Sequence, residues 1–156
     1  MSEVELKMIK EAMNCTLYTI QFIDDNMDEY EKFYSRFKDD LLYNPDLMKI
    51  VRIIGRIGDF GALERFFRPE GKMKDRVCAL PVLNSKLRLY CLRLSDKILI
   101  LGNGGVKNTR TYEESEELRG FVLTLQKFDE IIKAGVADGS IIVSENIIET
   151  DRTFDI

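Results

Sequence analysis

The stretch KLRLYCLRLSDKILIL, residues 86–101, decides the fold class. Residues 86–94 read as a strand, and at its start Leu87, Leu89 and Cys91 alternate with Lys86, Arg88 and Tyr90, which is the period-two pattern of a β-strand. The turn Ser95-Asp96 leads to residues 97–101, whose uniformly apolar end is typical of a central strand covered on both faces. Upstream, residues 76–82 read as a strand that ends at the turn Asn84-Ser85. Turns this short require antiparallel neighbours, so we expect a three-stranded meander.

The flanking sequence predicts helices and further strands around this meander. Residues 15–23 are rich in β-branched and aromatic residues and predict a strand. Two helices follow, one capped by Asn26 with apolar residues at helical spacing to Phe37, the other beginning at Asn44-Pro45 and running toward Gly58. The remaining expectations are a short helix over 3–14, a loop over 61–74, a turn at 103–105, a long helix over 113–134 stopped by Gly135, and a strand or hairpin over 140–150 with a frayed acidic end.

Length and composition favour one α+β domain over residues 1–156. The chain is 45% hydrophobic and 32% charged, which is enough apolar material for a real core. No stretch is apolar enough for a signal peptide or a transmembrane helix, so we expect a cytoplasmic protein with no membrane partner. The formal net charge of −4 argues against nucleic-acid binding over the whole surface. Any RNA contact must therefore be local.

The residue inventory also excludes several classes of site. The chain has no histidine, which removes His-dependent catalytic triads and His metal ligands. Its three cysteines, Cys15, Cys78 and Cys91, have no metal-type spacing, and we expect buried, reduced thiols. The glycines of residues 102–105 lack the spacing of a phosphate-binding loop. We therefore expect no metal and no cofactor.

Two cationic and aromatic clusters are the candidate functional residues. Strand alternation places Lys86, Arg88 and Tyr90 on one side of the sheet. The segment after the next strand adds a second set, which is Lys107, Arg110 and Tyr112. If the two sets meet at one end of the sheet and project into solvent, cations can hold RNA phosphates while aromatic rings stack on bases. The alternative is that these cations form ordinary ion pairs and Tyr90 is partly buried.

The order strand, helix, helix, loop, meander, helix resembles the RelE/ParE/HigB superfamily of toxins from bacterial type II toxin-antitoxin systems. The local matches are KLRLY (86–90), DKILIL (96–101) and GVKNTRTY (105–112), which are similar to the family's Tyr-Arg-Leu-x-Tyr strand, its apolar following strand and its closing basic segment. Residues 15–23 resemble the opening strand, and Leu63 to Phe67 lie where the family has a short Leu-Arg-Gly-type element. The resemblance covers about residues 15–134, so that the N-terminal helix and the C-terminal strand are additions to a RelE-like core.

The resemblance implies a toxin or toxin-like component of a toxin-antitoxin pair. Its partners would be an antitoxin, of helix-turn-helix type, and, for members that cut messenger RNA, the ribosome and mRNA. It implies a metal-independent endoribonuclease in which Lys86, Arg88, Arg110 and Tyr112 are catalytic while Tyr90 and Lys107 bind RNA. Residues 78–82 depart from the family's basic strand, and the chain is acidic where these toxins are usually basic. The alternatives are a non-catalytic protein-binding or regulatory module of the same fold, or an unrelated α+β domain.

Overall fold

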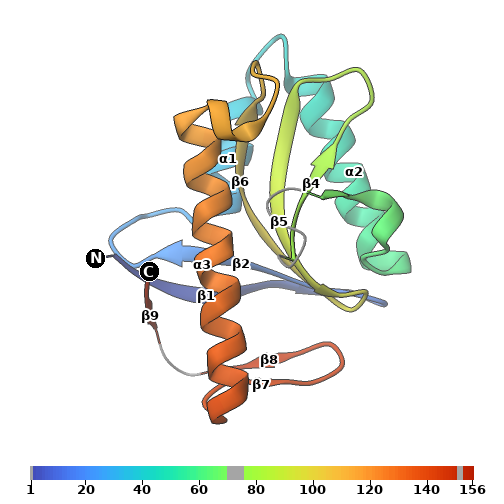
Figure 1. The fold of residues 1–156 in the computed structure, drawn as a ribbon. Coiled ribbons are helices and arrows are strands. Elements are labelled where there is room, and N and C mark those ends of the chain that lie inside the picture. The colour runs from blue at the N-terminus through green and yellow to red at the C-terminus, as the bar shows by residue number, and fades with distance from the viewer. Residues whose placement is uncertain (1, 70–75, 151–152) are drawn as a thin grey trace.

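The computed structural model describes residues 2–69, 76–150 and 153–156 (Figure 1). Within these residues the chain forms a seven-stranded sheet, of order β3-β4-β5-β6-β2-β1-β9, together with a separate β7-β8 hairpin. The helices are α1 (Glu29–Phe37), α2 (Asn44–Phe60) and α3 (Glu116–Asp138). The strands are β1 (Glu3–Glu11), β2 (Thr16–Phe22), β3 (Arg68–Pro69), β4 (Val77–Pro81), β5 (Leu87–Ser95), β6 (Ile98–Val106), β7 (Ile142–Val143), β8 (Ile148–Glu149) and β9 (Phe154–Asp155).

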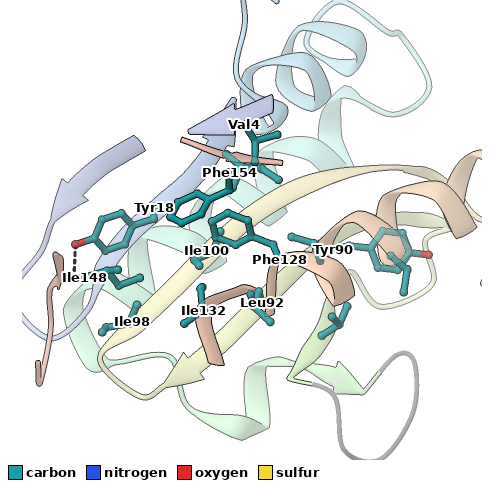
Figure 2. Close-up of a cluster of buried hydrophobic side chains, with 14 of the residues drawn as sticks. Val4, Tyr18, Tyr90, Leu92, Ile98, Ile100, Phe128, Ile132, Ile148 and Phe154 are labelled. Carbon is teal, nitrogen blue, oxygen red and sulfur yellow. Dashed lines mark hydrogen bonds between the residues drawn. The ribbon is translucent and has the colours of Figure 1, made fainter. Parts of the chain in front are cut away.

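The sheet is the middle of three layers. One hydrophobic cluster joins its first face to α3, through residues such as Tyr90, Leu92 and Phe128 (Figure 2). A second cluster joins the opposite face to α1 and α2, through residues such as Leu89 and Ile50. Because helices cover both faces, strand alternation separates two buried sets of side chains instead of a buried set from an exposed one.

The central predictions are confirmed. β4, β5 and β6 form an antiparallel meander, and residues 98–101 of β6 are fully buried. The two sequential helices and the long α3 are present, as is the hairpin within residues 140–150. The antiparallel arrangement expected for the meander does not extend to β2, which pairs with β6 in parallel, with Thr16 opposite Ile98. The fold is therefore α+β with a mixed sheet.

The prediction of an N-terminal helix is wrong, because residues 3–11 form strand β1. This strand pairs antiparallel with β2, from Val4 opposite Phe22 to Glu11 opposite Thr16. Val4 is fully buried while Met8 is 45% exposed. Residues 3–8, EVELKM, alternate charged and apolar side chains, which is the period-two pattern of a half-buried strand, and the alternation is interrupted at Ile9, where the register with β2 shifts.

Three boundaries also differ from the expectation. Asp28, not Asn26, caps α1 in a capping box with Glu31. β6 continues through residues 102–106, where a turn was expected. α3 passes Gly135 and ends at Gly139, which adopts a left-handed φ of 83°. No helix in the described parts of the chain combines the length and the apolar character needed to cross a membrane.

Two segments predicted to be irregular, the loop over 61–74 and the C-terminal end, contribute strands to the two edges of the sheet. In the expected loop over 61–74, Glu64–Phe66 form a 3-10 turn and β3 pairs with β4; residues 70–74 of that loop lie outside the described residues. At the other edge, β9 pairs with β1 and buries Phe154, so the described end of the tail is part of the sheet. Residues 151–152 lie outside the described residues.

Candidate nucleic-acid interface

Two lysines meet at one end of the sheet, where β5 begins and β6 ends. The backbone N–H of Lys107 donates to the carbonyl oxygen of Lys86 at 2.7 Å, which extends the ladder one step beyond the pair Leu87 and Val106. Lys86 is exposed and Lys107 is half-buried. Neither lysine has a carboxylate within 4 Å among the described residues. The two sequence clusters are therefore adjacent at this point.

Arg88 lies one strand position further in and is half-buried. It is paired with Gly105 across the ladder, and its Nη1 donates to the carbonyl oxygens of Ser85, at 2.7 Å, and Leu87, at 3.0 Å. Ser85 Oγ in turn donates to Asp46 Oδ2 at the start of α2, at 2.6 Å. The turn between β4 and β5 is thus fastened to α2, and it orients the Arg88 guanidinium.

A β-bulge shapes the backbone beside Arg88. Tyr90 on β5 faces two residues of β6, Gly102 and Asn103, between the pairs Leu89–Gly104 and Cys91–Leu101. The backbones approach so closely that a Cβ on Gly104 would lie 1.9 Å from the carbonyl oxygen of Arg88. Glycine is therefore required at residue 104 by packing.

The expectation that Tyr90 projects into solvent is wrong. Its side chain is fully buried under α3, in the hydrophobic cluster of that face. The ring of Tyr112 contacts it edge-on, with ring centroids 6.5 Å apart, and is itself half-buried. Tyr90 therefore supports Tyr112 from below and offers no face to an RNA base.

The outermost cation of the region is Arg110, whose side chain is 92% exposed and whose Nε lies 3.9 Å from Glu114 Oε1. Such an exposed pair is weak, because water screens it. Arg110 precedes the short 3-10 turn Tyr112–Glu114 that leads into α3. The candidate residues therefore share one end of the sheet, but they differ widely in exposure.

An ion pair that the sequence does not indicate also lies at this end. Arg36, in the last turn of α1, places Nη1 2.6 Å from Glu117 Oε1, in the first turn of α3. A Cβ on Gly105 would lie 3.1 Å from that carboxylate oxygen. Glu117 thus reaches the position on β6 that faces Arg88. No local pattern connects residues 36 and 117, so sequence reasoning had no signal for this contact.

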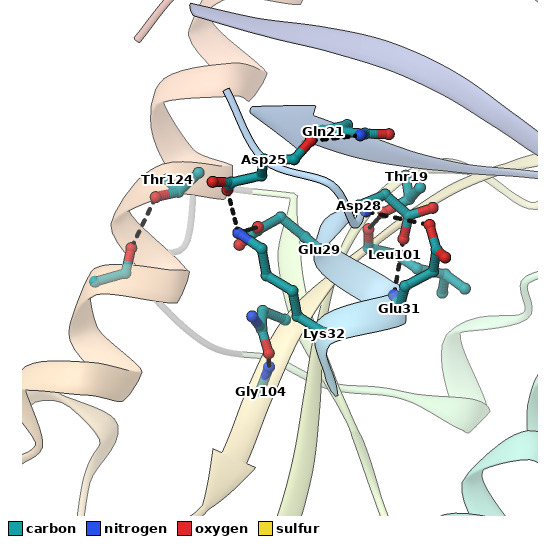
Figure 3. Close-up of polar contacts among 12 residues, drawn as sticks. Thr19, Gln21, Asp25, Asp28, Glu29, Glu31, Lys32, Leu101, Gly104 and Thr124 are labelled. Atoms are coloured by element: carbon teal, nitrogen blue, oxygen red, sulfur yellow. Dashed lines mark hydrogen bonds and ion pairs between the residues drawn. The ribbon is translucent and has the colours of Figure 1, made fainter. Parts of the chain in front are cut away.

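A second charged cluster ties β1 to the start of α1, where Figure 3 shows Asp28 with Glu31 and Lys32 with Asp25. Lys7 Nζ donates to Asp28 Oδ2 at 3.2 Å, while Asp28 accepts the backbone N–H of Glu31 at 2.8 Å. Burial raises the pKa of Asp28, whereas hydrogen bonding with Asp28 lowers the pKa of Glu31. Lys32 donates to Asp25 at 2.5 Å beside them. Because these charges are satisfied by one another, we assign this cluster a structural role.

The cysteines are buried and free, as expected. Burial raises the pKa of Cys15 to about 11 and that of Cys91 well above its ordinary value, so both thiols are protonated at neutral pH and poorly nucleophilic. In the described parts of the chain, no three Cys, Asp or Glu side chains gather in a way that could hold a metal ion.

The chemistry available at this end of the sheet is that of phosphate binding beside a carboxylate. Lys86, Lys107 and Arg88 supply cationic N–H donors, and Glu117 supplies a group able to accept a proton. Comparisons of the chain with protein-family models, with curated proteins and with solved structures found no match.

Proposed function

We propose that the protein is a RelE-like toxin, or toxin-like component, of a toxin-antitoxin pair, and that it cleaves messenger RNA on the ribosome. The observation that carries the proposal is the juxtaposition of Lys86 and Lys107 beside Arg88 at one end of the sheet. The element order β2, α1, α2, β4, β5, β6, α3 supports it, because the same order underlies the resemblance. An antitoxin of helix-turn-helix type would then be the protein partner, in the cytoplasm.

The proposed reaction is attack of a ribose 2′-hydroxyl on the adjacent phosphate. The new O2′–P bond forms as the P–O5′ bond breaks, which leaves a cyclic phosphate and a free 5′-hydroxyl. The charge on the phosphorane is stabilised by Arg88 and Lys107, with Arg110 holding a neighbouring phosphate. Lys86 and Glu117 are the candidate groups for taking the 2′ proton and returning one to O5′, and Tyr112 is the candidate for stacking.

Two observations favour the alternative, a non-catalytic protein-binding module of the same fold. Tyr90 is buried, which removes one of the two expected stacking rings. The pairs Arg36–Glu117 and Arg110–Glu114 also place carboxylates among the cations, which weakens attraction to RNA. Such a module would bind its partner through protein contacts and leave mRNA intact.

A charge-matched pair of double variants tests the proposal. Lys86→Ala/Lys107→Ala removes the juxtaposed lysines, whereas Lys49→Ala/Lys127→Ala removes two exposed lysines from α2 and α3. Each variant is expressed to measure growth arrest, and each purified protein is incubated with ribosomes and mRNA to measure cleavage. We expect the wild type and the control to arrest growth and cleave, and the site variant to lose at least about tenfold in cleavage rate, the order of one charge-assisted contact.

The pH dependence of the cleavage rate distinguishes the two candidate bases, Lys86 and Glu117. If Glu117 takes the proton, Glu117→Gln loses the acid limb of the rate profile while Lys86→Met keeps it. Equal cleavage by the two double variants would refute the site. A wild type that binds its partner but neither arrests growth nor cuts mRNA would establish the non-catalytic alternative.

A further inference from the structure

A cleft of about 680 Å³ lies at the end of the sheet opposite Lys86 and Lys107. Its walls are the C-terminal half of α3, the turn between β5 and β6, and the β7-β8 hairpin, which in Figure 1 extends beside the lower end of α3. The apolar lining comes from Leu94, Ile132, Val136 and Val143. The volume is within the range of pockets that bind small ligands or short peptide segments.

The hairpin wall is held in place by the core. Ile148 is buried, and its backbone N–H donates to Tyr18 Oη at 2.9 Å (Figure 2). Ile141 is buried against Gly135, where a Cβ would meet the Ile141 side chain at 2.4 Å. Between these two anchors Val143 lines the cleft and is 36% exposed, and Val136 on the facing helix α3 is 48% exposed. The cleft is therefore pre-formed, and its apolar lip remains open to solvent.

The rim of the cleft carries more positive than negative charge. Asp129 is 2% exposed and accepts both Arg76, at 2.5 and 2.8 Å, and Lys133, at 3.2 Å, so two cations share one carboxylate. Lys97 donates to a neutral group, the amide oxygen of Asn14, at 3.3 Å. Glu145 on the hairpin is an opposing carboxylate, and Asp96 on the rim is bound by Arg93. Two carboxylates, Asp129 and Glu145, therefore face three cations, which are Arg76, Lys97 and Lys133. One positive charge at the rim is left uncompensated.

We propose that this cleft binds an extended segment of a partner protein, in which aliphatic side chains alternate with carboxylates. The aliphatic groups would fill the apolar lining, and the carboxylates would pair with Lys97 and Lys133 at the rim. Charge complementarity favours this occupant, because the rim cations are only partly neutralised within the chain. The open lip favours a peptide over a fatty acid, since an acyl chain in this cleft would leave much of its surface in water. The site uses neither Lys86 nor Lys107, so it goes beyond the proposed function.

The probe is a short fluorescein-labelled peptide of alternating leucine and aspartate, with a leucine and lysine peptide as its charge-reversed counterpart. Binding to the intact protein is measured by fluorescence anisotropy. Val136→Asp places a carboxylate in the cleft, and Leu123→Asp is its matched control, because the two residues lie on α3 with 48% and 46% exposure. Leu123 is not among the residues that line the cleft. Circular dichroism verifies that both variants fold.

We expect the wild type to bind the acidic peptide at least about tenfold more tightly than the basic one, the order expected from one charge-assisted contact. Val136→Asp should weaken binding about tenfold or more, while Leu123→Asp should leave it unchanged. Lys133→Gln, which removes one rim cation, should reduce the preference for the acidic peptide. Three results would each overturn the proposal: no binding of the acidic peptide, equal losses in the two aspartate variants, or binding of decanoate in the cleft without binding of the peptide.

Discussion

Replacing Gly104 by alanine tests the close approach of β5 and β6 beside Arg88. The added Cβ would lie 1.9 Å from the Arg88 carbonyl oxygen, and it needs at least 3.0 Å, so the two backbones must separate by about 1.1 Å. We expect the loss of two ladder hydrogen bonds, at about 1 kcal/mol each, and an overpacking cost of about 1–3 kcal/mol. The free energy of unfolding should therefore fall by about 3–5 kcal/mol.

Gly120→Ala is the matched control. Gly120 lies inside α3 and has nothing within 4 Å of the added Cβ, so alanine should stabilise the helix by about 0.5–1 kcal/mol. Both variants are compared with the wild type by urea denaturation followed by circular dichroism at 222 nm. With a slope of about 2 kcal/mol/M, Gly104→Ala should lower the midpoint by roughly 1.5–2.5 M. A Gly104→Ala midpoint that equals the wild-type value would refute the account of the bulge.

Further perturbations address burial and hydrogen bonding elsewhere. Burial raises the pKa of Tyr30 to about 12, so its neutral phenol stabilises the folded state fully below pH 10 and loses that effect as pH rises toward 12. Between pH 8 and pH 11 the wild type should lose about 1.4 kcal/mol more unfolding free energy than Tyr30→Phe, as measured by denaturation at both pH values. Asp129→Asn leaves two cations without their buried carboxylate and should cost about 2–4 kcal/mol, whereas Arg110→Ala should change unfolding free energy by less than about 0.5 kcal/mol. Tyr18→Phe leaves a buried N–H without its acceptor and should cost about 1–3 kcal/mol, with faster amide hydrogen exchange at Ile148 as its local signature.

The sequence predicted those parts of the fold that are determined by residues close together along the chain. Tight turns after residues 82 and 94 require antiparallel pairing, and the apolar run 98–101 requires burial. The helix prediction for β1 overlooked the alternation of charged and apolar side chains over residues 3–8, which ends at Ile9, where the register with β2 shifts. The parallel pairing of β2 with β6 joins residues about 80 positions apart, and no local pattern encodes it. The glycine-rich residues 103–105 predict a turn, whereas β6 continues through them and close strand packing requires the glycine at residue 104.

The sequence predicted where the candidate residues lie on the sheet better than it predicted how exposed their side chains are. Alternation correctly placed Arg88 and Tyr90 on one side of the sheet, but that side is covered by α3 at Tyr90. The exposure of a strand's side chains depends on which helix covers that face of the sheet, and the sequence of the strand alone does not determine this. The juxtaposition of Lys86 and Lys107 follows from the β5-β6 hairpin and was therefore within reach of sequence reasoning. The pair Arg36–Glu117 depends on two helices that meet only in the folded chain.

The position of β2 between β6 and β1 has a consequence for the order of folding. Its contacts with β6, including the bond from Thr19 Oγ1 to the Leu101 carbonyl oxygen at 2.7 Å, span 82 residues, whereas the meander of β4, β5 and β6 closes through short turns. Closing so long a loop is entropically costly, so we expect the meander and the β1-β2 hairpin, which both close through short turns, to form early and to pair with each other later. In a kinetic experiment, Thr19→Val should mainly accelerate unfolding, while Leu92→Ala in the meander should mainly slow folding.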